Sequence, residues 1–124
     1  MENQKIIESA RDYIYRKNIL NNLCSVYKIK CVYVLQPVFV LSKNLVGKTD
    51  QQISKWILKY FKNDEVIYKI GYAEISNLDR SIKYNLINIF DNQSNIYFDH
   101  VHTNKYRSEI IGKELRKILD IEKN

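Results

Sequence analysis

The chain has 124 residues, of which 45% are hydrophobic and 12% aromatic, so its composition excludes a disordered tail. A chain of this length buries enough surface for one core if it folds by itself. Its formal net charge is +6, but the basic residues are scattered and form no block interleaved with aromatic residues, so we expect no nucleic acid partner.

The first expected element is a long amphipathic helix. Apolar side chains recur at helical spacing from Glu2 to Tyr27, which predicts one helix over this range. The β-branched and aromatic run from Ile29 to Leu35 then predicts a short strand that is covered on both faces. Gln36 and Pro37 end this strand, because proline cannot donate to a strand ladder.

Two helices are expected in the middle of the chain. Thr49 and Gln52 have the spacing of a capping box, which predicts a helix from Thr49 to about Lys62. Trp56 is expected to pack on the core face of this helix. Apolar residues at helical spacing predict a further helix from about Asp64 to Ser76.

The last third of the chain contains a second predicted strand, from Ile82 to Leu86, and a terminal helix from about Asn104 to Leu119. Between them, a short extended run brings Asp99 and His102 into a loop. The order helix, strand, helix, helix, strand, loop, helix is typical of an α/β layer fold with a parallel sheet. Two strands alone make no stable sheet, so we expect that the rest of the domain is missing upstream.

The two cysteines, Cys24 and Cys31, fit neither a zinc knuckle nor a redox motif, and we expect two thiols packed in the core. The apolar run that begins at Cys31 is too short to cross a bilayer, so no transmembrane segment is expected. No apolar signal-peptide region follows the polar N-terminus. The cytoplasm is therefore the default expectation, while the true compartment stays unknown.

Both histidines of the chain lie directly after a carboxylate, in Asp99-His100-Val101-His102. In a catalytic interpretation, Asp99 orients the ring of His102, which then acts as a general base on a serine hydroxyl. In a metal interpretation, His100 and His102 bind an ion together with Asp99, although three ligands without a second cluster rarely make a closed site. In a structural interpretation, both histidines are ordinary loop residues.

The context of this tetrad resembles the last block of the SGNH/GDSL hydrolases. There an extended segment ends in Asp-x-x-His and leads into the C-terminal helix, as Asn95–Asn104 does here. The segment Val34-Leu35-Gln36-Pro37 resembles a strand end of the same family. The resemblance implies a partial three-layer α/β/α fold (SGNH/flavodoxin-like), with a short parallel sheet flanked by helices. It also implies that residues 1–124 are a single partial domain, the C-terminal half of an SGNH-type hydrolase domain.

The resemblance further implies ester hydrolysis or acyl transfer, with Asp99 as the orienting acid, His102 as the base, and neither a metal nor a cofactor. An ester-containing small molecule or an acylated glycan is the implied substrate. The family's Gly-Asp-Ser block, which carries the nucleophile, is absent from the chain, so we expect no activity from the chain alone. Another chain supplying the missing N-terminal half is an expected partner. The alternative is a non-catalytic interaction module derived from a hydrolase fragment.

Overall fold

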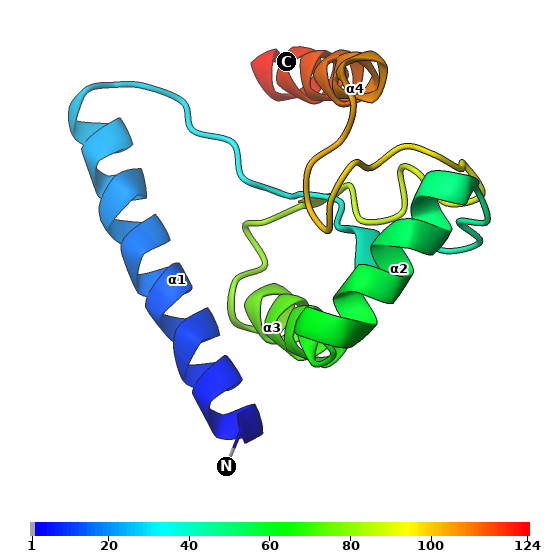
Figure 1. The fold of residues 1–124 in the computed structure, drawn as a ribbon. Helices are drawn as coiled ribbons and strands as arrows, with labels where there is room; N and C mark the ends of the chain where they lie inside the picture. Colours follow the sequence, from blue (N-terminus) through cyan, green and yellow to red (C-terminus); the bar gives the residue numbers. More distant parts are fainter. Residues whose placement is uncertain (1) are drawn as a thin grey trace.

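The computed structural model describes residues 2–124 as four α-helices, one short 3₁₀ turn and one pair of very short strands (Figure 1). The helices are α1 (Glu2–Val26), α2 (Lys48–Tyr60), α3 (Asp64–Leu78) and α4 (Lys105–Lys123). The 3₁₀ turn η1 is Phe39–Leu41, and the strands are β1 (Val34–Leu35) and β2 (Tyr84–Asn85). The four predicted helices are thus confirmed, each with its ends displaced by only a few residues.

The predicted fold class is wrong. Helix accounts for 61% of the structure, and the only sheet in residues 2–124 is the parallel pair of β1 and β2, two residues each. The runs predicted as strands, Ile29–Leu35 and Ile82–Leu86, contain no other strand residues, and beyond the paired residues the backbone N–H of Leu86 still donates to the carbonyl of Leu35 at 2.9 Å. Because so few hydrogen bonds join the strands, no sheet layer exists for helices to cover, and the chain is not a three-layer α/β/α fold.

Two small hydrophobic cores hold the helices together. The first lies between α2 and the loop that precedes α4; its buried members are Phe39, Ile53, Ile57, Phe90, Ile96 and Tyr97. The second joins α1 to α3 around β1, through the buried side chains of Ala10, Leu35 and Ile75. Ile96 and Tyr97 lie directly before the loop that contains Asp99 and His102. Because both are buried in the first core, they attach this loop to it.

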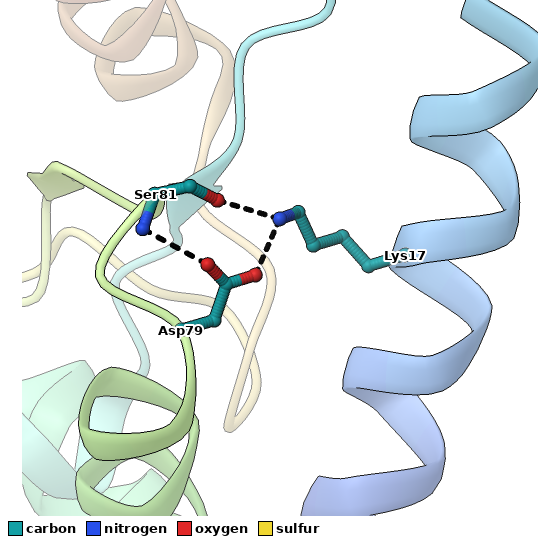
Figure 2. A network of polar contacts seen from close by, with 3 residues as sticks. All are labelled: Lys17, Asp79 and Ser81. Carbon is teal, nitrogen blue, oxygen red and sulfur yellow. Dashed lines mark hydrogen bonds and ion pairs between the residues drawn. The ribbon is translucent and has the colours of Figure 1, made fainter.

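A buried ion pair attaches α1 to the loop that follows α3. Lys17 is only 8% exposed, and its ammonium group contacts both the carboxylate of Asp79 and, at 2.6 Å, the hydroxyl of Ser81 (Figure 2). The other oxygen of Asp79 accepts the backbone N–H of Ser81 at 2.9 Å. The ring of Tyr33 lies 4.7 Å from the ammonium nitrogen and adds a cation–π contact. The lysine is therefore fully paired, as a buried charge must be.

The cysteines are not the packed free thiols that the sequence predicts. Cys24, in the last turns of α1, forms a disulfide with Cys31, seven residues further along the chain. The bond closes the connection between α1 and β1 into a short loop. Apolar surroundings predict packed thiols, but α1 ends at Val26 between the two cysteines, and the turn that follows brings Cys31 back to Cys24.

The start of α2 also differs from the predicted capping box of Thr49 and Gln52. The cap is Gly47, whose backbone N–H donates to the carboxylate of Asp50 at 2.9 Å. Asp50 is 1% exposed, and the same oxygen accepts the backbone N–H of Asn95 at 2.9 Å. A side chain at position 47 would overlap Asn95, because a Cβ atom there would lie 2.2 Å from its Oδ1 atom. The helix start is thus joined to the segment that leads to Asp99.

Much of the molecule's surface stays uncovered. The accessible area is 8864 Å², whereas a compact monomer of this mass exposes about 7,000 Å². The C-terminal half of α1 runs away from the other helices in Figure 1. Its exposed apolar side chains Tyr15, Ile19, Leu23 and Val26 follow one another at helical spacing on one face.

Within residues 2–124, no helix combines the length and apolar character needed to cross a bilayer.

Candidate active site

A tight hairpin presents the candidate site. Tyr97 and Thr103 form an antiparallel bridge, and inside it the backbone N–H of Phe98 donates to the carbonyl of His102 at 3.1 Å. The backbone preceding the turn is fixed because Ile96 and Tyr97 are fully buried in the first core. Asp99 to His102 are therefore held at a surface turn whose base is rigid.

Asp99 organises this turn through both of its carboxylate oxygens. Oδ1 accepts the backbone N–H groups of Val101, at 2.8 Å, and of His102, at 2.7 Å. Oδ2 lies 2.6 Å from Nδ1 of the His102 ring. The ring of Phe98 stacks on that of His102, with centroids 5.8 Å apart and an interplanar angle of 14°. The Asp-x-x-His spacing therefore brings both side chains together within one turn, as the catalytic interpretation predicts.

The electrostatics keep Asp99 ionised. Partial burial by itself raises the pKa of this carboxyl group, but the hydrogen bonds from the His102 and Val101 backbone amides and from the His102 ring outweigh it and lower the pKa to about 2. In the neutral tautomer whose Nδ1–H donates to ionised Asp99, the Nε2 atom of His102 keeps its lone pair. The His102 side chain is 67% exposed, so this atom is accessible to a reacting group. The pair has the orientation of the acid and base of a Ser-His-Asp triad.

No nucleophile completes this pair within residues 2–124. The His102 ring hydrogen-bonds only to Asp99, and the nearest threonine and serine hydroxyls in sequence, those of Thr103 and Ser108, bond to each other at 3.1 Å. Ser42 bonds to Tyr97 and Ser81 to Lys17, so both are used in structural contacts. The arrangement can therefore accept and stabilise a proton but has no serine of its own to activate.

His100 lies apart from this pair. Its ring packs against Phe61 at 5.0 Å and Trp56 at 5.5 Å between centroids, while His102 stacks on Phe98. In the part of the chain from 2 to 124, no three His, Cys, Asp or Glu side chains gather in a geometry that holds a metal ion. The two histidines are not placed to share an ion, and the structure brings only His102 to Asp99.

A hollow of about 260 Å³ opens beside the pair, between α2 and the hairpin. The residues that line it are Thr49, Gln52, Ile53, Trp56, Phe98 and Asp99. Trp56 is 39% exposed and Phe98 63% exposed, so Trp56 is not the core anchor that the sequence predicts. A larger hollow of about 360 Å³ lies between η1, α2 and the start of α3, and neither Asp99 nor His102 lines it.

Sequence reasoning assigned only structural roles to the residues of α2 that line the hollow beside the Asp99–His102 pair. Thr49, Gln52 and Trp56 are separated by three and four positions, a spacing that places them on one face of a helix. That periodicity was a usable signal, but nothing in the sequence indicates that the face meets Phe98, more than forty residues away. No protein-family model, curated protein or solved structure matches the chain. The geometry of this site is therefore the main basis for a functional assignment.

Proposed function

We propose that the chain is the C-terminal part of a serine ester hydrolase of the SGNH/GDSL type, in which Asp99 orients His102 and His102 acts as the general base. The observation that carries this proposal is the 2.6 Å contact between Asp99 Oδ2 and His102 Nδ1. The other oxygen of the same carboxylate accepts the backbone N–H groups of Val101 and His102 and so stabilises the turn. A loop histidine in a purely structural role does not need this second contact.

In the proposed reaction, the Nε2 atom of His102 removes the proton of a serine hydroxyl as the serine oxygen attacks the ester carbonyl. The imidazolium that forms is stabilised by ionised Asp99 and then gives its proton to the departing alcohol. In the second half of the reaction, His102 removes a proton from water as the water oxygen attacks the acyl-serine ester. The imidazolium then returns the proton to the serine oxygen as the carboxylic acid departs. The serine and the donors that stabilise the oxyanion come from a segment outside this chain, and each such donor is worth about 10²–10³ in rate.

Two features support a covering segment. The chain exposes 8864 Å², well above a compact monomer of its mass, and the apolar face of α1 formed by Tyr15, Ile19, Leu23 and Val26 is open. A segment that carries strands and a serine would cover such surfaces. The same face also favours the second candidate, an interaction module that binds another chain and in which Asp99 and His102 have no catalytic role.

The test begins with the DNA directly upstream of Met1. We expect a reading frame there, continuous or shifted, that encodes a strand, a Gly-Asp-Ser block and a helix; unrelated sequence would favour the interaction module. The 124-residue chain alone should not turn over p-nitrophenyl acetate, whereas the chain joined to the upstream segment should do so.

In the joined protein, Asp99→Asn should lower turnover by about 10⁴-fold, because the wrong His102 tautomer is then favoured. His102→Ala should lower turnover at least as far. Ser108→Ala is the matched control, since Ser108 lies just beyond the hairpin and bonds to Thr103, not to His102. Hydrolysis that survives His102→Ala would refute the role of His102 as the general base.

A further inference from the structure

We infer that the C-terminal end of α1 and the loop after it bind the surface of an anionic lipid membrane, without crossing it. Lipid binding goes beyond the proposed function and does not involve the Asp99–His102 pair. It assigns the open face of α1 to lipid. The remaining exposed area of the chain is then left to the covering segment of the proposed hydrolase.

The helix α1 has apolar side chains on two opposite faces. One face packs on α3 and β1 through Ala10 and the partly buried Ile14. A surface helix of a globular protein normally carries polar residues opposite such a stripe, as α1 does near its N-terminus with Glu8 and Asp12. In the C-terminal half, the opposite face is apolar instead, and its exposed side chains are Tyr15, Ile19, Leu23 and Val26. This half of the helix therefore has a second apolar face without a partner among residues 2–124.

The loop after α1 continues this apolar surface. Val26, Tyr27 and Ile29 are 74%, 72% and 60% exposed, and they lie inside the loop that the Cys24–Cys31 disulfide closes. The backbone N–H of Ile29 donates to the carbonyl of Cys24 at 2.7 Å, so the loop is held in one shape. A surface that is already ordered loses little conformational freedom when it binds. We call this surface the α1 tip; its members are Tyr15, Ile19, Leu23, Val26, Tyr27 and Ile29.

The composition of the α1 tip fits the boundary between water and lipid. Exposed apolar patches mark contacts with membranes or with other proteins. A helix that lies on a membrane buries its apolar face at the level of the headgroups and acyl chains, and tyrosine rings are enriched at that depth. A flat surface can reach the tip, because the C-terminal half of α1 runs away from the other helices (Figure 1).

The charges around the α1 tip favour an anionic lipid surface. The chain has 14 Asp and Glu residues, but none lies in the stretch 13–49, which contains the tip. Arg16, Lys28 and Lys30 lie in this stretch beside the tip. Lys28 makes no ion pair within residues 2–124, while Arg16 and Lys30 take part in ion pairs whose basic side chains are 76% and 59% exposed. Such exposed pairs are weak, so these cations can also contact lipid phosphates.

Two other occupants of the α1 tip are less favourable. A second copy of the chain has the same net charge of +6 and the same basic residues beside its tip, so pairing two tips brings like charges together. A segment upstream of Met1 that carries strands can instead extend the pair of β1 and β2, since each strand has one unpaired edge within residues 2–124.

Vesicle flotation tests the inference on the 124-residue chain. One set of vesicles contains phosphatidylcholine alone, and the other contains equal parts of phosphatidylcholine and phosphatidylglycerol. We expect the chain to float with the anionic vesicles and not with the neutral ones, and its flotation should fall as the salt concentration rises. Flotation with neither set, or equal flotation with both, would overturn the inference.

Two leucines provide a matched pair of apolar variants. Leu23→Ala should weaken the apparent Kd for anionic vesicles about fivefold, because it shortens an apolar side chain of the α1 tip. Leu58→Ala, on α2, should leave the Kd within about twofold. Leu58 is 71% exposed and Leu23 49%, so the control removes the more exposed apolar side chain. Equal effects of the two substitutions would contradict binding through the tip.

Two exposed lysines provide the corresponding pair of charge variants. Lys28→Gln should weaken the apparent Kd about fivefold, the contribution of one lysine close to an anionic bilayer. Lys55→Gln removes the same charge from α2 and should change the Kd by less than about twofold. Circular dichroism should stay unchanged in all four variants, since each altered side chain is largely exposed. Equal losses from the two lysine variants would mean that net charge alone causes binding, and would overturn the inference.

Sedimentation equilibrium and the joined protein distinguish the other occupants. A dimer that Leu23→Ala dissociates, in a chain that does not bind vesicles, would assign the α1 tip to a second copy and overturn the inference. The chain joined to its upstream segment should still bind anionic vesicles. Binding that is lost on joining would mean that the upstream segment covers the tip, and would also overturn the inference.

The joined protein also separates lipid binding from the proposed function. Vesicle binding without ester hydrolysis would refute the hydrolase proposal and leave the lipid-binding surface standing. Hydrolysis of p-nitrophenyl acetate without vesicle binding would refute the lipid-binding surface alone.

Discussion

Asp99 holds His102 at both the backbone and the ring: its Oδ1 atom accepts the backbone N–H of His102 at 2.7 Å, and its Oδ2 atom lies 2.6 Å from the ring Nδ1. One carboxylate thus fixes where the residue lies and how its imidazole is turned. A partner that bonds only to the ring would leave the backbone of the turn free to move. The first two predictions test this double contact.

The ionised carboxylate of Asp99 should fix the His102 tautomer. In the unchanged chain at alkaline pH, ¹⁵N NMR of the ring should show the proton on Nδ1. In Asp99→Asn, the side-chain oxygen can still accept the two backbone amides, but the amide nitrogen donates to Nδ1, so the proton should move to Nε2. The same spectrum reports His100, whose ring packs on Phe61 and Trp56 and makes no hydrogen bond to Asp99, so its signals should stay unchanged. An unchanged His102 spectrum would mean that the Asp99 contact does not form in solution.

Acid should unfold the hairpin in a defined pH window. The pKa of Asp99 falls from its ordinary value of 3.8 to about 2 in the folded chain, so the folded state favours the ionised form. This stabilisation is complete above about pH 4 and is lost as the pH falls through about 2. The amide signals of Val101 and His102 should therefore shift with a midpoint near pH 2. Asp99→Asn should show no such transition at these amides.

Removing the buried lysine should strongly destabilise the chain. Lys17→Met leaves the carboxylate of Asp79, whose side chain is only 12% exposed, without its charged partner, which should cost about 3 kcal/mol in the free energy of unfolding. Adding Asp79→Asn should recover part of this loss, because an asparagine oxygen can still accept the Ser81 amide. Urea denaturation followed by circular dichroism measures both variants.

The control for that series is Arg11→Met. Arg11 also joins α1 to α3, through a 3.8 Å contact with Glu74, but its side chain is 62% exposed. An exposed ion pair of this kind contributes at most about 1 kcal/mol. Similar losses from Lys17→Met and Arg11→Met would argue against a buried role for Lys17.

The disulfide should stabilise the connection between α1 and β1. Cys31→Ser should lower the free energy of unfolding by about 2–3 kcal/mol, as expected for opening a loop of this size. Dithiothreitol should lower the stability of the unchanged chain by the same amount and have no effect on the variant. Stable disulfides persist in oxidising compartments, so we also expect the protein isolated from its own cells to carry no free thiol. Two free thiols in that material would contradict the pairing.

The carboxylate of Asp50 should be essential for the start of α2. It accepts the amides of Gly47 and Asn95, and Asp50→Ala leaves both without this partner. A hydrogen bond to a charged group contributes about 1.5–3 kcal/mol, so we expect the loss of both bonds to cost about 2–4 kcal/mol in urea denaturation. Asp120→Ala removes an exposed carboxylate of α4 and should change stability by less than about 0.5 kcal/mol. Comparable losses in the two variants would contradict the buried contact.

Local features of the molecule could be read from the sequence. The helices follow from apolar residues at helical spacing, and α4 begins after Asn104, whose side chain accepts the backbone N–H of Arg107. The contact of Asp99 with His102 was predictable for the same reason, since the two residues lie three positions apart and one turn brings them together. In each case the partners are neighbours in the chain, so residue type and spacing suffice.

Contacts between distant segments were decided only by the tertiary structure. Apolar β-branched runs predict strands, but whether Val34 and Tyr84 pair over two residues or over a whole sheet depends on how the helices bring the runs together. The pairing of Lys17 with Asp79 and the hollow between Trp56 and Phe98 join residues more than forty positions apart. The free energy of such contacts depends on the burial and geometry of both partners at once, and neither segment specifies these by itself. The sequence by itself thus determined the helices and the Asp99–His102 turn, whereas the tertiary structure decided the fold class and the hollow beside that turn.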